Sequence, residues 1–312
     1  MILWLHNNIF VKCMKKLLHP LLNKLFLDGC SDYNTLAVRR ASRSKKQARD
    51  MFEKHDIPHA KGAIFFWPFK ALKFVKEHGF PVVIKPNFGG YSRGSYFPIQ
   101  SYKELWKAMF WTKFWWPVSV IEQYLLGKNY RVVVVKGSIA VVMERFPPFI
   151  VGDGIQTISE CIDSENQTRE SMKLYPEMHP ITKNRKVIQF LKKQDLTLRS
   201  ILTKGERVDL FHRVSLEPGG VLADIPIETI TTKNKEIFLK ILDLFDANIF
   251  GLDVIMEQGI EYDFDTQKCI FLELNSRPYL KMHAFPRFGK KPDMKAVYKK
   301  LEALDIGEKD DF

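Results

Sequence analysis

Three oxygen-bearing side chains lie in two short apolar runs of the sequence. Asp253 lies within Gly-Leu-Asp-Val-Ile at 251–255, and Glu273 and Asn275 lie within Phe-Leu-Glu-Leu-Asn at 271–275. Successive side chains of a β-strand point to opposite faces, so Glu273 and Asn275, two residues apart, point the same way. Mg²⁺ prefers oxygen ligands and is usually held by one or two carboxylates together with substrate phosphates. This spacing therefore predicts a magnesium site that serves a nucleotide.

The alternative is that Asp253, Glu273 and Asn275 lie at a solvated sheet edge and bind nothing. The β-branched and apolar residues around them, followed by Arg277, favour the metal site. Buried carboxylates are rare unless they are paired or bound to metal. On this interpretation, Glu273→Gln or Asp253→Asn abolishes turnover with little loss of folding.

A lysine and a group of glycines form a second candidate for phosphate contact. Lys85 ends the apolar run at 81–85, and Gly89, Gly90 and Gly94 follow it. Glycine lets a backbone approach phosphates closely, and the lysine adds positive charge. Glycine-rich turns are also common after strands, so an ordinary turn remains the alternative for this motif alone.

A mixed polar and apolar segment follows the next predicted strand, at residues 122–129. It reads Glu-Gln-Tyr-Leu-Leu-Gly-Lys-Asn. Such a segment can present backbone groups and a carboxylate to a purine, and a polar side chain to a ribose. The alternative is an ordinary linker between two lobes.

The pattern along the chain predicts an α+β protein of two lobes. Besides the two metal-bearing runs, alternating apolar residues predict strands at 60–66, 81–85, 118–124 and 207–213. Helical spacing predicts helices at 45–55, 68–78, 101–114 and 233–245. A polar helical region is predicted from 158 to about 202, broken near Pro176 and Pro180. The β-rich runs 130–135 and 138–145 flank Lys136-Gly137, which predicts a hairpin.

Bulk composition is that of a globular protein, with 46% hydrophobic and 27% charged residues among 312. No apolar run approaches the ~20 residues that span a bilayer. The start of the chain lacks a small-residue cleavage site, so we expect no secretory signal and a cytoplasmic location. The four cysteines are far apart, which favours reduced thiols over a zinc site or disulfides.

Positive charge is concentrated at the start of the sequence. The net charge is +12, and residues 1–50 hold ten Lys/Arg against three Asp. Apolar residues between Phe10 and Leu25 recur at helical spacing among lysines, which is typical of a basic amphipathic helix. Such a helix either covers the core of the main domain or contacts a membrane or partner. No nucleic-acid-binding signature accompanies the charge, so no nucleic acid is expected.

A dense aromatic cluster occupies residues 106–116. It contains Trp106, Phe110, Trp111, Phe114, Trp115 and Trp116. One helix face cannot bury so many large rings. Most of the cluster is therefore expected in the core of the small lobe, and the rest as a contact surface for a partner, a second subunit or a membrane.

Taken as a set, the motifs resemble the ATP-grasp carboxylate-amine ligases, in the cyanophycin synthetase-like and bifunctional glutathione synthetase-like branch. The resemblance covers about residues 43–290 in unbroken order. Its motifs lie at 80–86, 89–94, 122–132, 151–154, 179–183, 205–208, 219–220, 251–253, 273–278 and 282–283. It implies an ATP-grasp fold in which two lobes hold ATP.

The resemblance also implies roles for individual residues. Those matching nucleotide contacts are Lys45, Lys46, Lys85, Gly89, Gly90, Gly94, Glu122, Gln123, Tyr124, Leu125 and Asn129. Asp253, Glu273 and Asn275 match ligands of magnesium, with manganese as the alternative and two ions expected. Arg277 and Arg213 match clamps on the transferring phosphate. Asn129 stands where the family often has an acid, and Ser92 where it usually has glycine.

The implied reaction joins a carboxylate to an amine through an acyl phosphate. Candidate substrate contacts are Arg145, Asp153, Gly154, Gly219, Gly220 and His283, each of which could equally be a surface or packing residue. The expected substrates are ATP and an amino acid or small peptide. Polymer synthesis is not expected, because the chain lacks the extra domains of the long synthetases. Two alternatives remain, an ATP-grasp-type kinase of a small-molecule hydroxyl and a non-catalytic basic binding module.

The predicted organisation has three parts. Residues 1–42 form the basic segment, 43–290 the ATP-grasp domain, and 291–312 a charged tail. Within the domain, the small lobe covers about 60–125 and the larger lobe about 126–290. A homo-oligomer is left open.

Overall fold

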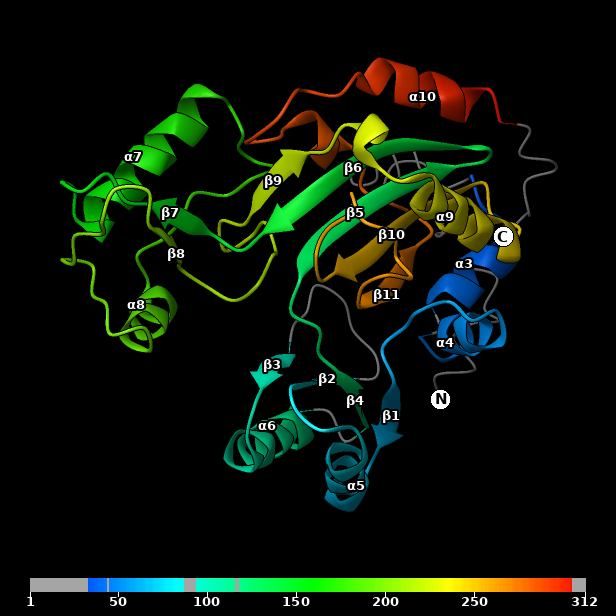
Figure 1. Cartoon of the computed structure of the whole chain (residues 1–312), viewed down its shortest axis with the longest axis horizontal. Helices are drawn as coiled ribbons and strands as arrows, with labels where there is room; N and C mark the ends of the chain where they lie inside the picture. The colour runs from blue at the N-terminus through cyan, green and yellow to red at the C-terminus, as the bar shows by residue number, and fades with distance from the viewer. Residues whose placement is uncertain (1–32, 44, 87–93, 116–117, 305–312) are drawn as a thin grey trace, which may run out of the picture. The chain divides into compact units, whose positions relative to one another are not determined.

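The structure is a computed structural model that describes residues 33–43, 45–86, 94–115 and 118–304 (Figure 1). The chain divides into two compact units. The large unit contains, of these residues, those within 33–48, 129–253 and 273–304, and the small unit those within 49–128 and 254–272. No helix in the described part of the chain is both long and apolar enough to cross a membrane.

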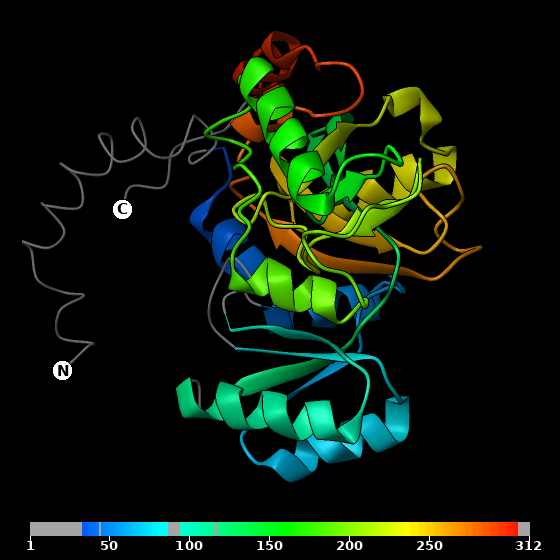
Figure 2. The same ribbon diagram turned by 90° about the vertical axis from the view of Figure 1, so that its left-hand side faces the viewer.

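The small unit is built on an antiparallel sheet in the order β1-β4-β2-β3. Its strands are β1 (Gly62–Phe65), β2 (Val82–Pro86), β3 (Tyr96–Ile99) and β4 (Ser119–Gln123). Helices α5 (Pro68–His78) and α6 (Tyr102–Trp115) lie together on one side of this sheet in both views (Figures 1 and 2). Helix α4 (Lys45–Lys54) precedes β1.

Successive side chains of β2 point to opposite faces of this sheet, and only one of these faces packs against the helices. Val82 and Ile84 are fully buried in the core that also contains Phe74 of α5 and Leu105 of α6. Val83 and Lys85 therefore point to the face away from the helices. Of the nucleotide candidates on this sheet, Lys85 and Glu122, which pairs with Val83, lie on this face, whereas Gln123 pairs with Val82.

The large unit contains a sheet in the order β11-β10-β5-β6-β9. Its strands are β5 (Lys128–Val135), β6 (Ser138–Phe146), β9 (Val221–Asp224), β10 (Ile249–Met256) and β11 (Cys269–Asn275). The predicted hairpin is confirmed, because β5 pairs antiparallel with β6 from Asn129↔Arg145 to Val135↔Ser138. Gly137 in its turn has φ of 78°, which glycine adopts without strain.

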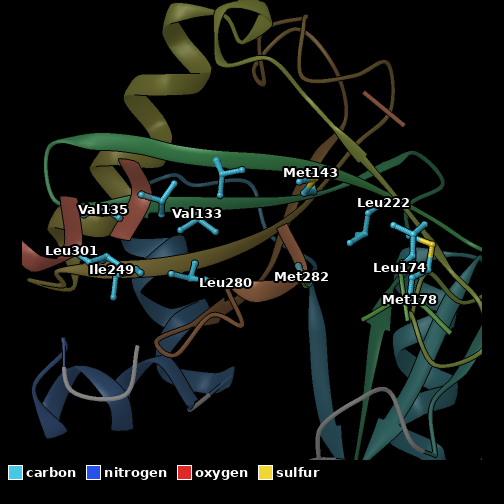
Figure 3. Close-up of a cluster of buried hydrophobic side chains, with 12 residues drawn as sticks. Val133, Val135, Met143, Leu174, Met178, Leu222, Ile249, Leu280, Met282 and Leu301 are labelled. Atoms are coloured by element: carbon cyan, nitrogen blue, oxygen red, sulfur yellow. The ribbon is translucent and has the colours of Figure 1, made fainter. Parts of the chain in front are cut away.

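Helices cover this sheet. They are α3 (Leu36–Arg43), α9 (Thr232–Leu244), α10 (Met294–Glu302) and the short 3₁₀ segments Ile227–Thr229 and Lys281–Ala284. Figure 3 shows the apolar cluster in which Val133, Met143 and Leu222 from the sheet meet Leu280 and Leu301. The segment predicted as a charged tail thus contains α10, whose apolar side packs into this core.

A smaller substructure within the large unit has its own core. It consists of β7 (Phe149–Val151), β8 (Arg207–Asp209), α7 (Ile158–Ser171) and α8 (Arg185–Lys192). Thr157 and Glu160 form a capping box at the start of α7. The predicted break near Pro176 and Pro180 in the helical region 158–202 is confirmed, because irregular chain joins α7 to α8. The predicted strand 207–213 ends at Asp209.

Candidate functional site

Asp253 of β10 is held by two arginines from neighbouring strands of the large unit. Arg131 Nε lies 2.5 Å from Asp253 Oδ1 and Arg131 Nη2 lies 3.1 Å from Oδ2, while Arg145 Nη2 lies 3.2 Å from Oδ1. The side chains of Asp253, Arg131 and Arg145 are only 8%, 13% and 15% exposed. The carboxylate is therefore the shared counter-ion of two buried guanidinium groups.

Strand register brings these arginines together. Arg145 of β6 pairs with Asn129 of β5, and Arg131 is two residues beyond Asn129. Residues two apart share a face, so the two arginines are diagonal neighbours on the same face of the hairpin. Burial lowers the pKa of Arg145, and the negative charge of Asp253 opposes that shift.

Gly251 provides the space through which Arg131 reaches Asp253. A Cβ at Gly251 would lie 3.1 Å from Arg131 Nη1, 3.3 Å from Arg131 Cδ and 2.8 Å from Pro278 Cβ. Any larger residue would push Arg131 away from the strand. The Gly-Leu-Asp motif thus combines a carboxylate with the gap that its arginine partner needs.

Asn275 and Glu273 lie two residues apart on the adjacent strand β11. Asn275 Nδ2 donates to the carbonyl oxygen of Gly251 at 3.2 Å, which leaves the amide oxygen as the ligand atom. Glu273 is exposed, and its charge acts on Arg145 together with that of Asp253. The three predicted metal ligands therefore belong to two hydrogen-bonded strands of one sheet.

The chemistry of these donors fits a hard cation. Two carboxylates and one amide supply oxygen atoms, the ligand type that Mg²⁺ prefers. No cluster of three or more His, Cys, Asp or Glu side chains that could hold a metal occurs among the described residues, so the set depends on the Asn275 amide. Both oxygens of Asp253 accept from arginines. A carboxylate has about four lone-pair sites, so a cation bound at Asp253 would share the carboxylate with these arginines or displace one of them.

His283 lies fully buried in the same region of the large unit. Both of its ring nitrogens lack a hydrogen-bond partner within the described part of the chain. Burial, with Arg131 and Arg145 nearby, lowers the pKa of His283 to about 3. This neutral, solvent-excluded imidazole does not favour the direct substrate contact expected from the sequence.

Lys85 and Glu122 form an ion pair in the small unit. In the register of β2 and β4, Glu122 pairs with Val83, which places Lys85 diagonally across on the same face. Arg49 of α4 adds a second contact, with Nη1 3.6 Å from Glu122 Oε1. Gly62 on β1 makes room for the group, because a Cβ there would lie 2.6 Å from Glu122 Cγ.

The segment after Glu122 turns out of the sheet. The backbone N–H groups of Gln123 and Tyr124 donate to the carbonyl oxygens of Lys61 and Pro81, at 2.9 and 3.0 Å. The Tyr124 ring stacks on Phe97 with centroids 5.6 Å apart, and burial raises the pKa of its hydroxyl. These contacts hold the backbone at Gln123 and Tyr124, which belong to the segment that the sequence predicts to receive a purine.

The structure describes fewer contacts for the other residues predicted to bind the nucleotide. Gly89 and Gly90 lie outside the described residues, as do the side chains of Lys45 and Lys46, the first two residues of α4. Gly94 has φ of 73°, as a turn requires. Asn129 lies on β5, opposite Arg145.

Asp153 and Gly154, two substrate candidates, have local structural roles. Asp153 Oδ1 accepts from the N–H groups of Ile155 and Gln156 at 2.8 and 2.7 Å, and these bonds lower the pKa of Asp153. Gly154 has φ of 85°. Asp153 and Gly154 thus form the turn that leads toward α7.

Gly219 and Gly220 are required by close packing. A Cβ at Gly219 would lie 2.9 Å from Ile181 Cγ1, and one at Gly220 would lie 2.4 Å from the Ser215 carbonyl oxygen. The Gly219 carbonyl accepts from Arg169 at 2.9 Å. Both glycines are therefore explained by the fold alone.

The two predicted phosphate clamps lie in irregular segments of the large unit. Arg213 follows β8 and Arg277 follows β11, and both are partly buried. Arg277 is only two residues beyond Asn275.

Sequence reasoning missed Arg131 and Arg49 as members of these charged groups. Arg131 directly precedes four valines in Tyr-Arg-Val-Val-Val-Val at 130–135, so a charge within an apolar strand was the available signal. Arg49 offered none, because its partner Glu122 is 73 positions away in the sequence. Only the fold brings that pair together.

Comparison with solved structures decides the fold. A bifunctional glutathione synthetase from Pasteurella multocida matches with a TM-score of 0.61 at 22% identity, over 86% of this chain and 37% of that one. The ATP-grasp ligase PsnB, in complex with a phosphomimetic precursor variant, Mg and ADP, matches with a TM-score of 0.51 at 13% identity, over 96% and 71%. The chain has the ATP-grasp fold. The α+β class expected from the sequence is confirmed.

Sequence comparison confirms the resemblance to two groups of ATP-grasp relatives. Cyanophycin synthetase of Crocosphaera subtropica is 27% identical over 83% of this chain and 30% of its own length. The glutathione biosynthesis bifunctional protein GshAB of Clostridium perfringens is 29% identical over 72% and 28%. This chain therefore spans less than a third of the length of either relative. No protein-family model matches it.

The shared counter-ion makes Asp253 a structural residue of this ATP-grasp fold. Asp253→Asn leaves Arg131 and Arg145 buried without a carboxylate, so we expect the free energy of unfolding to fall by about 3 kcal/mol. This revises the sequence-based expectation of little loss of folding for Asp253. Urea denaturation measures the change, with Glu273→Gln as the isosteric control at an exposed position, expected within about 0.5 kcal/mol of wild type. Equal stability of all three proteins would contradict the proposed role.

Buried His283 predicts a dependence of stability on pH. Its folded pKa of about 3 lies below its ordinary value of 6.5. Between these values the unfolded chain binds more protons, so stability decreases as pH falls, by about 2 kcal/mol from this group at pH 5. His283→Leu removes that loss and, near pH 7, changes stability by less than about 1.5 kcal/mol. Urea denaturation near pH 7 and at about pH 5 tests this, and identical pH dependence in both proteins would refute it.

Proposed function

We propose that this chain is an ATP- and Mg²⁺-dependent ligase that joins a carboxylate to an amine through an acyl phosphate. The observation that carries the proposal is the set of Asp253, Glu273 and Asn275 on adjacent strands of an ATP-grasp fold. The names of the relatives support it, since cyanophycin synthetase and the glutathione biosynthesis protein are both named for synthesis.

The reaction requires activation because a free carboxylate is a poor electrophile. Transfer of the terminal phosphoryl group of ATP to a carboxylate oxygen forms an acyl phosphate and releases ADP. The amine nitrogen then attacks the acyl carbon, the C–O bond to phosphate breaks, and the amine proton is lost as inorganic phosphate leaves. The protein's contribution is mainly to position the reactants and to stabilise developing negative charge.

Residues of the large unit supply the positive charge for this step. Asp253, Glu273 and Asn275 would hold Mg²⁺, which neutralises the charge of ATP phosphates when it is bound. Arg131 and Arg145 are neutralised mainly by Asp253 in this structure. If a cation took over the Asp253 oxygens, these guanidinium groups would become available to phosphate oxygens, for which their planar geometry is suited. We assign the same role to Arg213 and Arg277.

Residues of the small unit would bind the nucleotide. Lys85 supplies charge for the phosphates, and the backbone around Gln123 to Leu125 receives the adenine. Lys85 is paired with Glu122 in this structure, and Arg49 is a second partner for the same carboxylate. Glu122 can therefore remain paired when Lys85 turns to a phosphate. Asn129, which belongs to the large unit, is the candidate for the ribose.

The finer parts of the proposal are two bound ions and an amino acid or small peptide as the acceptor. Two ions are proposed because the donor set contains two carboxylates on adjacent strands. Arg145 remains a candidate substrate contact through its proximity to the metal ligands. We also propose that the 43–290 segment works as one ATP-grasp domain.

Product analysis tests the proposed reaction directly. The purified chain is incubated with ATP, Mg²⁺ and pools of amino acids and dipeptides, and mass spectrometry searches for a product lighter by one water than its two parents. Glu273→Gln is the control, because its side chain is exposed and isosteric, so turnover should fall by about 10²- to 10³-fold without loss of folding. A stable phosphorylated product would instead identify a kinase. Absence of ADP release would contradict both the ligase and the kinase assignments.

Loss of the Lys85 charge should weaken ATP use without unfolding the small unit. For Lys85→Met we expect kcat/KM for ATP to fall by about 10²-fold. The melting temperature should change little, because Arg49 still pairs with Glu122. The matched control is Lys136→Met, which removes the same charge at an exposed hairpin turn. If both variants lose activity equally, the loss comes from the change in net charge and not from the position of Lys85, and the assignment of Lys85 is wrong.

A further inference from the structure

Exposed aromatic residues occur on α5 and α6 of the small unit and on the two residues that precede α5. We call this group the aromatic face; it consists of Phe66, Trp67, Phe69, Trp106, Phe110 and Trp111. Phe69 is 74% exposed and Trp67 is 68% exposed. Large exposed apolar patches in a folded protein usually mark a contact surface.

The aromatic face joins the two helices. Lys113 of α6 donates to the carbonyl oxygen of Phe65 at 2.9 Å, and its Nζ lies 5.3 Å from the centroid of the Phe66 ring. Phe66 in turn packs edge-on against Trp67 at 5.2 Å. On α6, Phe110 lies one helical turn before Lys113, so this lysine links α6 to the Phe66–Trp67 pair that precedes α5.

These rings are not required by the core of the small unit. Helix α6 turns Leu105, Ala108 and Met109 into the apolar cluster beneath it, where all three are buried. Trp106 and Phe110, four residues apart, share another side of the helix and are exposed. A helix that met only water would carry polar residues at these positions.

Positive charge surrounds the aromatic face. The exposed lysines of the two helices are Lys70, Lys73, Lys76, Lys103 and Lys107. The acidic residues of these helices are Glu77, which pairs with Lys73 at 3.7 Å, and Glu104. The surface therefore combines aromatic rings with a net positive charge.

We infer that the aromatic face binds the surface of an anionic membrane. Tryptophan and other aromatic rings favour the boundary between headgroups and acyl chains, and lysines around them are attracted to anionic lipids. A second copy of the face would bring like charges together. Residues 1–50 of the chain are also basic, with ten Lys/Arg against three Asp. Their charge would therefore repel the lysines around the aromatic face, which argues against this segment as the occupant.

Vesicle flotation tests the inference with the full chain. Phosphatidylcholine vesicles with and without phosphatidylserine are compared at low and high salt. We expect binding to the phosphatidylserine vesicles that weakens with salt, and at least about a tenfold loss of partitioning for the double variant Phe69→Ser/Phe110→Ser. Both side chains are exposed, so the variant should keep its melting temperature and its ATPase rate.

The matched control is Ile155→Ser, which removes a 79% exposed apolar side chain from the large unit. Its vesicle binding should equal that of wild type. Unchanged binding by Phe69→Ser/Phe110→Ser would assign any membrane affinity to another segment and overturn the inference. So would a failure of wild type to bind phosphatidylserine vesicles, preferential binding to single-stranded RNA, or self-association that the double variant abolishes.

Discussion

The ion pairs of Asp253 with Arg131 and Arg145 determine the arrangement of the large unit's site. Three charges from three adjacent strands are buried together, so each is tolerated only because the others are present. The pairing requires the diagonal register of the hairpin and the absence of a side chain at Gly251. Once these conditions hold, the carboxylates and the amide of the candidate metal site are set on one sheet, beside the positive charge that a phosphate would need.

The small unit repeats this principle. Glu122 is a buried carboxylate on a central strand, Lys85 is its diagonal neighbour, and Gly62 supplies the space. In both units, a residue proposed to bind a ligand is neutralised by a protein partner of opposite charge. Ligand binding would then exchange one set of charged partners for another. Because each buried charge keeps a partner, the desolvation cost of a buried unpaired charge is avoided.

Much of the fold could be predicted because its signals are local. The β5–β6 hairpin follows from two β-branched runs around Lys136-Gly137, and α5 from helical spacing between Pro68 and Gly79. The short strands β3, β7 and β9 have three or four residues, and the sequence does not predict them. The equally short β1 and β8 lie inside the longer predicted strands 60–66 and 207–213. Helix α10 lies in the segment that the sequence predicts as a charged tail. Its charged residues outnumber the two residues that it buries, Val297 and Leu301, so its apolar side is a weak signal in the sequence.

The types and local spacing of the candidate ligands, and the resemblance to ATP-grasp ligases, could be determined from the sequence alone. Residues two apart on a strand must share a face, so Glu273 and Asn275 were predictable as a pair. Only the tertiary structure decided which charges meet, because Asp253 and its partner Arg131 are 122 positions apart. It also decided that His283 is buried away from solvent. Trp106, Phe110 and Trp111, the members of the aromatic cluster whose side chains the structure describes, are exposed, although the sequence predicts most of that cluster in the core. Burial and pairing depend on neighbours that are distant in sequence, and local pattern carries little information about them.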